Sequence, residues 1–209
     1  MFVKICGITS EADALLAVAL GADAIGFVFA PSPRQIAPLA AADIVKRLPP
    51  EIVTLGVFRD ETSQRVLEIV HAAHLHGAQL HGHESTETAF EVANGVRFSV
   101  KAVVAGSQSA RAGDTYGVDA LLVDGPNPGS GEAYDWELFN EIPASMRVIL
   151  AGGLTPDSVS QAIMLARPWG VDVSSGVEKS PGVKDAVKMR HFIANARSAA
   201  ALIGDDDLL

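Results

Sequence analysis

Residues 2–29 read FVKICGITSEADALLAVALGADAIGFVF, and their pattern predicts a strand, a helix and a second strand. Phe2–Cys6 is a short run of β-branched, aromatic and other apolar residues, which is typical of a strand. The spacing of apolar residues then becomes helical from Ser10 to Leu20, where Ser10 can cap the helix and Asp13 occupies its third position. Ala24–Phe29 is the next strand-like run. This order predicts a βαβ unit of a parallel sheet.

The same alternation continues along the whole chain. Strand starts recur about every 20–29 residues, as expected for consecutive βα units. The predicted strands are Phe2–Cys6, Ala24–Phe29, Val53–Phe58, Ala78–His81, Phe98–Val104, Ala120–Asp124, Arg147–Ala151 and Val171–Ser174. The predicted helices are Ser10–Leu20, Leu39–Leu48, Thr62–Ala73, Ser85–Asn94, Ser107–Ala112, Trp136–Ile142, Pro156–Ala166 and Lys184–Ala199.

Eight βα units in a chain of 209 residues predict an α/β protein with one closed (β/α)8 TIM barrel. We expect this single domain to span residues 1–203, followed by a frayed acidic tail at 204–209 with the sequence GDDDLL. The alternative is an open doubly wound sheet. The first strand is not followed by Gly-x-Gly-x-x-Gly, and no break in composition divides the chain into halves. The barrel is therefore the favoured fold.

Composition limits the classes of function. Hydrophobic residues make up 48% of the chain, and no apolar run reaches the roughly 18 residues of a membrane span. The single cysteine excludes an internal disulfide and fits a reducing compartment, so we expect a cytoplasmic protein. A net charge of −9 argues against binding to nucleic acid or to an anionic membrane, but it does not exclude a small anionic substrate. The predicted helix faces carry no obvious apolar stripe, which favours a monomer over a homodimer.

In a barrel of this kind the active site lies at the C-terminal ends of the strands, where Cys6 and Asp124 fall. Lys4 and Cys6 share one face of their strand, and a nearby ammonium group favours the thiolate. Asp172 shares a face with Ser174 on the eighth strand, next to the first, so we predict an interior pair of Lys4 and Asp172. Position alone leaves two interpretations open: Cys6 can be a small buried hydrophobe, and Asp124 a turn-forming residue.

Other residues at this end of the barrel could bind anions or contact a ligand. The last two strands lead into the glycine-containing turns LAGGLTPDS (150–158) and VDVSSGVEKSPG (171–182), which predict a phosphate site. Arg34, on a loop stiffened by two prolines, suits a carboxylate, although a solvated surface arginine is the commoner case. Five histidines between positions 71 and 83 scatter over different predicted elements, so we expect no metal site. The predicted phosphate ligands are Gly152, Gly153, Ser174, Ser175 and Gly176, and Gln79 and His81 share a face that could touch ligand.

Several of these segments together resemble the phosphoribosylanthranilate isomerase family of tryptophan biosynthesis. The matching motifs are KICGIT, GADAIGFVFAPSPRQI, LGVF, AQLHG, LLVD, YDW, LAGGLTPDSV and VDVSSGVEKSPGVKD, in this order from residue 4 to residue 185. The resemblance implies a (β/α)8 barrel that catalyses the Amadori rearrangement of N-(5-phosphoribosyl)anthranilate without a metal or organic cofactor. It also implies that Cys6 is the general base, Asp124 the general acid and Arg34 the group that binds the anthranilate carboxylate.

One stretch departs from this family pattern. The loop GPNPGSGEAYDW (125–136) stands where members more often have Gly-Gly-Thr-Gly before the Phe/Tyr-Asp-Trp motif. Two other functions remain alternatives: a different phosphosugar isomerase or epimerase on the same barrel, and a non-catalytic sensor of a phosphorylated ligand. The related histidine-pathway isomerase would have an aspartate at the end of the first strand, and Cys6 counts against it.

Overall fold

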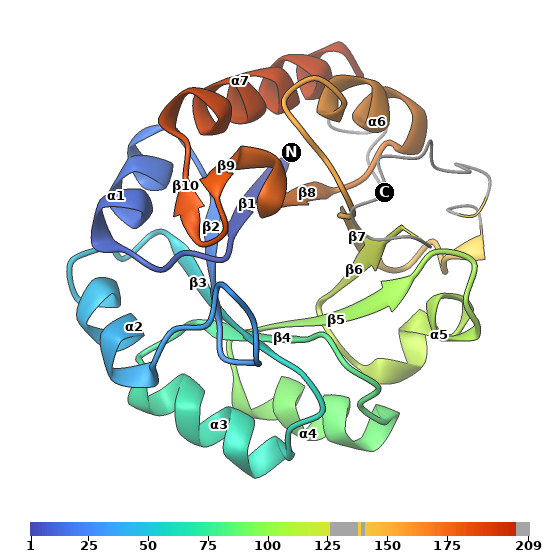
Figure 1. The fold of residues 1–209 in the computed structure, drawn as a ribbon. Helices are drawn as coiled ribbons and strands as arrows, with labels where there is room; N and C mark the ends of the chain where they lie inside the picture. Colours follow the sequence, from blue (N-terminus) through green and yellow to red (C-terminus); the bar gives the residue numbers. More distant parts are fainter. Residues whose placement is uncertain (126–137, 139–140, 204–209) are drawn as a thin grey trace.

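Eight parallel strands form a closed barrel in the computed structural model, which describes residues 1–125, 138 and 141–203. The strands pair in the order of the chain, and β1 closes the ring by pairing with β8 (Figure 1). This confirms the predicted (β/α)8 barrel. The strands are β1 (Phe2–Cys6), β2 (Ala24–Val28), β3 (Val53–Phe58), β4 (Gly77–Leu80), β5 (Phe98–Val104), β6 (Ala120–Asp124), β7 (Arg147–Leu150) and β8 (Gly170–Val173).

Helices form a ring around the barrel. Four of them are preceded by a serine or threonine whose hydroxyl accepts a hydrogen bond from the backbone N–H three residues later, which satisfies one of the free donors of the first turn. The helices are α1 (Glu11–Ala19), α2 (Pro38–Val45), α3 (Ser63–Ala72), α4 (Thr86–Gly95), α5 (Gln108–Arg111), α6 (Val159–Ala166) and α7 (Ala186–Ile203). Short 3-10 helices cover Gly113–Tyr116 and Ser175–Val177.

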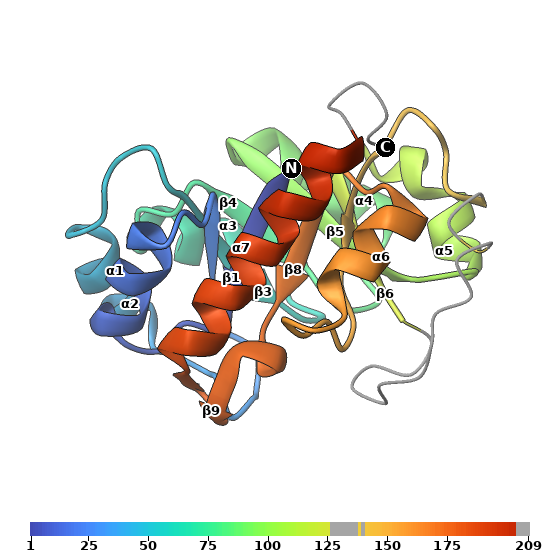
Figure 2. The ribbon, with the colours of Figure 1, turned by 90° about the horizontal axis from the view of Figure 1, so that it is seen from above.

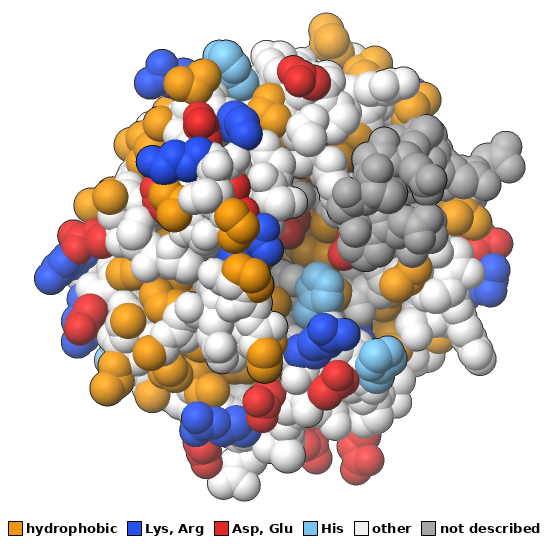
Figure 3. All heavy atoms as spheres, viewed as in Figure 1, with side chains coloured by type: hydrophobic (Ala, Val, Ile, Leu, Met, Phe, Trp, Pro, Cys, Tyr) orange, Lys and Arg blue, Asp and Glu red, His pale blue; other side chains and the backbone are white. Residues whose placement is uncertain are grey.

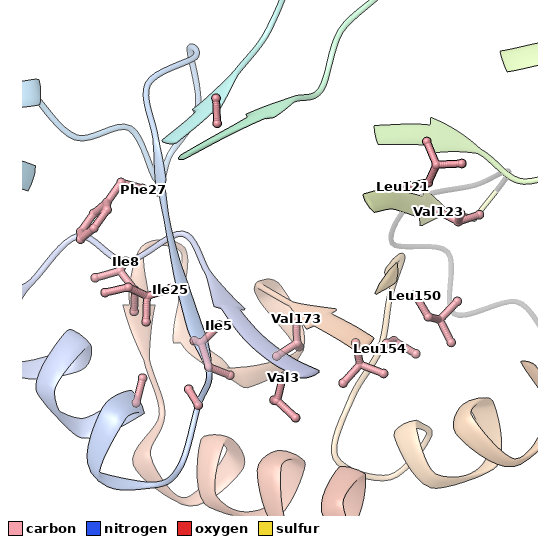
Figure 4. Packing of buried hydrophobic residues seen from close by; sticks show 14 of the residues in the cluster. Val3, Ile5, Ile8, Ile25, Phe27, Leu121, Val123, Leu150, Leu154 and Val173 are labelled. Carbon is pink, nitrogen blue, oxygen red and sulfur yellow. The ribbon is translucent and has the colours of Figure 1, made fainter. Parts of the chain in front are cut away.

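Buried apolar residues form two layers. One layer lies between the strands and the helices, where side chains such as Val3, Ile5 and Val173 point outward from β1 and β8 (Figure 4). The other fills the barrel interior and includes Leu122 and Ile149. Because both faces of the sheet are covered, the strands are nearly continuous apolar runs instead of alternating ones. The charged and polar residues inside the barrel are therefore exceptions to this apolar pattern, and several of them lie at the candidate site.

The structure corrects the predicted starts of two helices. The Thr155-Pro156 signal predicted a helix from residue 156, but α6 begins at Val159. Thr155 and Ser158 instead brace the turn before it, where each hydroxyl accepts a hydrogen bond from the other residue's N–H, at 3.2 and 3.0 Å. The prediction of a helix from Lys184 was also wrong. That residue ends a small hairpin of β9 (Glu178–Ser180) and β10 (Val183–Lys184), and α7 begins after it.

Two predictions lie wholly or largely outside the described residues: the helix Trp136–Ile142 and the tail 204–209. Within the described ranges, no helix is long and apolar enough to cross a membrane.

Candidate active site

A cavity of about 550 Å³ opens at the C-terminal ends of the strands. Figure 2 shows the barrel from the side, with β9 at one end, and Figure 3, viewed as Figure 1 with β9 in front, shows the middle of the molecule's face hollowed. Most of the residues predicted from the sequence line it: Cys6, Arg34, Gln79, His81, Asp124, Gly152, Gly153, Asp172, Ser174 and Ser175. Lys4 is fully buried, and neither Lys4 nor Gly176 is among the lining residues.

Lys4 and Asp172 form an ion pair inside the barrel, as the strand register predicted. The two residues are directly opposite each other on β1 and β8, and Lys4 Nζ donates to Asp172 Oδ1 at 2.8 Å. Burial by itself would lower the pKa of Lys4, but Asp172 and Cys6 together outweigh burial and raise the pKa above its ordinary value. The pair thus keeps a positive charge and a negative charge next to Cys6.

Cys6 is 7% exposed and lies directly above this pair. Burial is the strongest influence on its thiol and raises the pKa of Cys6, while Lys4 acts in the opposite direction and Asp172 reinforces the rise. Lys4 therefore lowers the pKa of Cys6, which is the direction expected from the sequence. Burial outweighs it, so Cys6 rests as a neutral thiol near pH 7.

Gly26 leaves room for these two side chains. It faces Cys6 across the β1–β2 pairing, and a Cβ at this position would lie 2.8 Å from Cys6 Sγ and 3.0 Å from Lys4 Nζ. Both distances are shorter than ordinary van der Waals contact. The absence of a side chain at Gly26 of β2 therefore allows Cys6 and Lys4 to occupy their positions.

Arg34 is paired with Glu178 by two parallel hydrogen bonds. Arg34 Nε donates to Glu178 Oε1 and Nη2 donates to Oε2, both at 2.8 Å. This bidentate geometry fixes the plane of the guanidinium group. The hydrogen bonds to Glu178 raise the pKa of Arg34. The described residues offer no hydrogen-bond partner to Nη1, and Arg34 lines the cavity, so it can still bind an anion there.

Lys184 is the second cation on Glu178. Its Nζ donates to Glu178 Oε1 at 3.0 Å and to the carbonyl oxygen of Ser174 at 3.1 Å. Burial would raise the pKa of Glu178, but the hydrogen bonds from Arg34 and Lys184 lower it below its ordinary value. With all three groups charged, this cluster has a net single positive charge, which suits an anionic ligand.

The sequence analysis did not single out Glu178 or Lys184. Both lie in the segment VEKSPGVKD, and the signal that could have found them is a pair of opposite charges flanking the Pro181-Gly182 turn. The hairpin places Lys184 opposite Glu178.

Asp124 lies at the end of β6, where Oδ1 accepts a hydrogen bond of 3.0 Å from the N–H of Gly125. His81 follows β4, and its Nε2 is 3.7 Å from Asp124 Oδ2. Gln79 Nε2 lies 2.9 Å from His81 Nδ1. These three side chains are thus connected along one wall of the cavity.

The glycine turns after β7 and β8 touch each other. Gly152 and Gly153 have φ of 88° and 68°, a conformation that side chains disfavour. Gly176 packs against the first turn so closely that a Cβ would lie 1.9 Å from the carbonyl oxygen of Leu154. Gly176 therefore permits this approach of the two loops, while Gly152, Gly153, Ser174 and Ser175 face the cavity.

The histidine-rich segment does not converge on one point. His76 bonds to Thr54 beside β3, His81 faces Asp124, and the His83 side chain is exposed beside Asp60. In the part of the chain that the structure describes, no group of three His, Cys, Asp or Glu residues is arranged to hold a metal ion.

In enzymes with a closed (β/α)8 barrel the active site lies at the C-terminal ends of the strands, and the cavity of this chain opens at that end, so fold and cavity are those of a barrel enzyme. Residues 3–195 match the family model of N-(5'-phosphoribosyl)anthranilate isomerase. The chain belongs to this family, and it is an isomerase of tryptophan biosynthesis.

Individual relatives agree with this membership. The chain is 47% identical to the N-(5'-phosphoribosyl)anthranilate isomerase of Desulforudis audaxviator, over 94% of this chain and 98% of the relative. The crystal structure of the Thermus thermophilus phosphoribosyl anthranilate isomerase is 45% identical, with a TM-score of 0.87 and coverage of 96% and 100%. A structure of the isomerase in complex with reduced 1-(o-carboxyphenylamino)-1-deoxyribulose 5-phosphate is 38% identical, with a TM-score of 0.83 and coverage of 95% and 99%.

Proposed function

We propose that this cavity binds N-(5'-phosphoribosyl)anthranilate and that Cys6 and Asp124 rearrange it as general base and general acid. The observation that carries the proposal is that both residues line one cavity together with Arg34 and the two glycine turns. An Amadori rearrangement requires a general acid and a general base, and a carboxyl group and a thiol can serve as this pair, while Arg34 and the glycine turns are suited to the two anionic ends of the substrate.

The order of strands around the barrel supports one orientation of the substrate. Arg34 follows β2, the glycine turns follow β7 and β8, and β1 lies between β8 and β2. A substrate with its phosphate on the glycine turns and its carboxylate on Arg34 therefore passes the end of β1, where Cys6 lies. Backbone N–H groups of Gly153 and Ser175 are suited to phosphate, and the guanidinium group to carboxylate.

The chemistry begins with two proton transfers, one at the ring oxygen and one at C2', which are both bonded to C1'. Asp124 in its acid form protonates the furanose ring oxygen, and the C1'–O bond breaks as the anilino nitrogen forms an iminium ion. Cys6 as thiolate then removes the C2' proton, and the electron pair of that C–H bond neutralises the iminium to give an enolamine. The enolamine tautomerises to the ketone. The positive iminium acidifies C2', so a thiolate is a sufficient base.

The raised pKa of Cys6 defines when the thiolate forms. Before substrate binds, burial keeps the thiol neutral, with Lys4 acting against burial. A cationic intermediate above Cys6 adds a second positive charge near Sγ and favours the thiolate at the step that uses it. Substrate binding between two anion sites would supply further rate by holding C2' near Sγ.

Turnover of purified protein is the first test. N-(5'-phosphoribosyl)anthranilate would be generated from anthranilate, phosphoribosyl pyrophosphate and the preceding transferase, and its consumption followed by fluorescence. We expect turnover by the unmodified chain and a loss of at least about 100-fold in kcat for Cys6→Ser and for Asp124→Asn. Glu68→Gln, at an exposed position on α3, is the control and should leave the rate unchanged.

Other outcomes would select the alternatives. Turnover that survives Cys6→Ser would remove the base role and leave Cys6 as a packing residue. Binding of substrate without turnover would favour a sensor, and turnover of a different sugar phosphate alone would favour another isomerase or epimerase. We further expect a cytoplasmic monomer, which sedimentation of the purified chain and fractionation of cells would test.

A further inference from the structure

Gln79 is a buried polar residue with one unused hydrogen-bonding atom. It is 1% exposed and lines the cavity between Val57 of β3 and Val100 of β5 in the strand register. Its Nε2 contacts His81 Nδ1 at 2.9 Å, while its Oε1 is buried and has no hydrogen-bond partner among the described residues. A buried amide oxygen without a hydrogen-bond partner costs free energy, so the placement of Gln79 in the barrel wall calls for an explanation.

The contact between Gln79 and His81 selects one tautomer of the imidazole. Gln79 Nε2 carries only donors, so Nδ1 must accept, and a neutral ring then carries its proton on Nε2. Gln79 of β4 and His81 directly after it are two residues apart in extended chain, so both side chains point to the same face. The Nε2–H of His81 is consequently on the side of the ring 3.7 Å from Asp124 Oδ2.

The backbone around His81 is held firmly. Its N–H donates to the carbonyl oxygen of Phe58 at 2.8 Å. In the next residues, the buried Lys101 donates to the carbonyl oxygen of Gly82 at 2.7 Å and to Glu84 at 2.8 Å. The imidazole is therefore presented by a fixed segment, and only a side-chain rotation is needed to shorten the 3.7 Å separation to a hydrogen bond of about 3 Å.

We propose that His81, held by Gln79, is a positioning residue that donates a hydrogen bond to Asp124 at the moment the acid loses its proton. The N–H of Gly125 faces Oδ1 and His81 Nε2–H faces Oδ2, so each oxygen of the carboxylate meets a donor. When Asp124 transfers its proton to the sugar ring oxygen, the negative charge left behind is stabilised by both. This inference rests on the acid role of Asp124 in the proposed function. Separations of this kind often tighten only in the substrate complex.

The test combines NMR of the imidazole with kinetics of matched variants. Labelling with 15N-histidine reports which ring nitrogen carries the proton, and the signal of His81 among the six histidines is assigned by its loss in His81→Gln. We expect Nε2–H in the unmodified chain. Gln79→Glu replaces the donor by an acceptor of the same shape and should move the proton to Nδ1.

Kinetics then separates the role from simple packing. His81→Leu should lower kcat about 10- to 100-fold, the range of one hydrogen bond to a charged group, with KM changed less than about threefold. His81→Gln, which keeps an N–H near the position of Nε2, should recover most of this loss. His83→Leu is the control, because that side chain is 91% exposed and is not among the residues that line the cavity.

Each possible result of these experiments either supports the inference or overturns it. A resting Nδ1–H tautomer, or a His81→Leu variant with the kcat of the unmodified chain, would overturn the inference. Equal losses in His81→Leu and His81→Gln would also overturn it, since a donor at Nε2 would then be irrelevant. In all these cases the unmodified chain still turns over and Asp124→Asn is still inactive. Absence of turnover in the unmodified chain would instead overturn the proposed function, and this role of His81 with it.

Discussion

Arg34 and Glu178, which are 144 residues apart in the chain, meet through two hydrogen bonds of 2.8 Å. They join the loop after β2 to the hairpin after β8, and Lys184 binds the same carboxylate from inside. Glu178→Gln removes the negative charge and leaves Lys184 buried beside a neutral amide. We expect the free energy of unfolding to fall by about 3 kcal/mol, as when a buried ion pair loses one partner. Urea denaturation measures this change.

The same variant tests the proposed contact of Arg34 with the substrate carboxylate, which it should weaken. Without Glu178 the guanidinium group loses its fixed plane, so we expect KM to rise about 10-fold, or about 1.4 kcal/mol in binding, with a smaller change in kcat. Glu68→Gln is the matched control, because its pair with Arg65 is exposed and contributes under about 0.5 kcal/mol. An unchanged KM in Glu178→Gln would show that Arg34 does not need this support.

Lys4 and Asp172 form the second buried pair, and it is suited to a double-mutant cycle. Asp172→Asn leaves the fully buried Lys4 without its counter-charge, so we expect a loss of about 3–5 kcal/mol in the free energy of unfolding. The double variant Lys4→Met/Asp172→Asn carries neither charge and should recover much of that loss. If the two single changes simply add, Lys4 and Asp172 do not stabilise each other and the pair is not maintained in solution.

Much of the fold could be predicted because strands covered on both faces are continuous apolar runs. Each predicted strand agrees with the structure to within one residue at either end. The pairing of Lys4 with Asp172 was also predictable, since closure of the barrel brings the first and last strands together and side chains alternate along both. The roles of Cys6 and Asp124 came from the family resemblance, because position alone leaves a buried thiol and a turn aspartate equally good explanations.

The features of the site that could not be predicted depend on contacts between segments that are far apart in the sequence. Nothing in the local pattern connects Arg34 to Glu178, and the local preference for a helical spacing of apolar residues predicts a helix from Lys184, two residues before α7 begins. Its burial on Glu178 is a tertiary effect that overrides this preference. The degree of burial of Cys6 could not be predicted either. The sequence shows that Lys4 is close to Cys6 but not how completely both side chains are enclosed.

The thiol of Cys6 should ionise only at alkaline pH in the protein without substrate. Burial raises its pKa, so alkylation by iodoacetamide should have a midpoint above about 8.5, the value of an unperturbed cysteine. Asp172 contributes to the rise and Lys4 opposes it, so Asp172→Asn should lower the midpoint and Lys4→Met should raise it further. Rates measured as a function of pH test all three. A midpoint below about 8 in the unmodified chain would mean that Lys4 outweighs burial.

The same shift links stability to pH. A raised pKa means that the folded chain retains the thiol proton where the unfolded chain has lost it, so this contribution is complete below about pH 8.5 and is lost as the pH rises through the folded pKa. The free energy of unfolding should therefore fall above about pH 8.5 by more in the unmodified chain than in Cys6→Ser. Parallel curves for the two proteins would contradict the raised pKa.

Gly176 connects the two turns that we propose bind phosphate. In Gly176→Ala the new Cβ would lie 1.9 Å from the carbonyl oxygen of Leu154, which is backbone and cannot rotate away. The loops after β7 and β8 must separate, so we expect the free energy of unfolding to fall by about 1–3 kcal/mol and the affinity for inorganic phosphate to weaken. Calorimetric titration with phosphate and urea denaturation measure the two effects. Met164→Ala, at an exposed position on α6, is the control and should leave phosphate affinity unchanged. Phosphate affinity that is preserved in a destabilised Gly176→Ala protein would mean that the two turns do not have to touch in order to bind the anion.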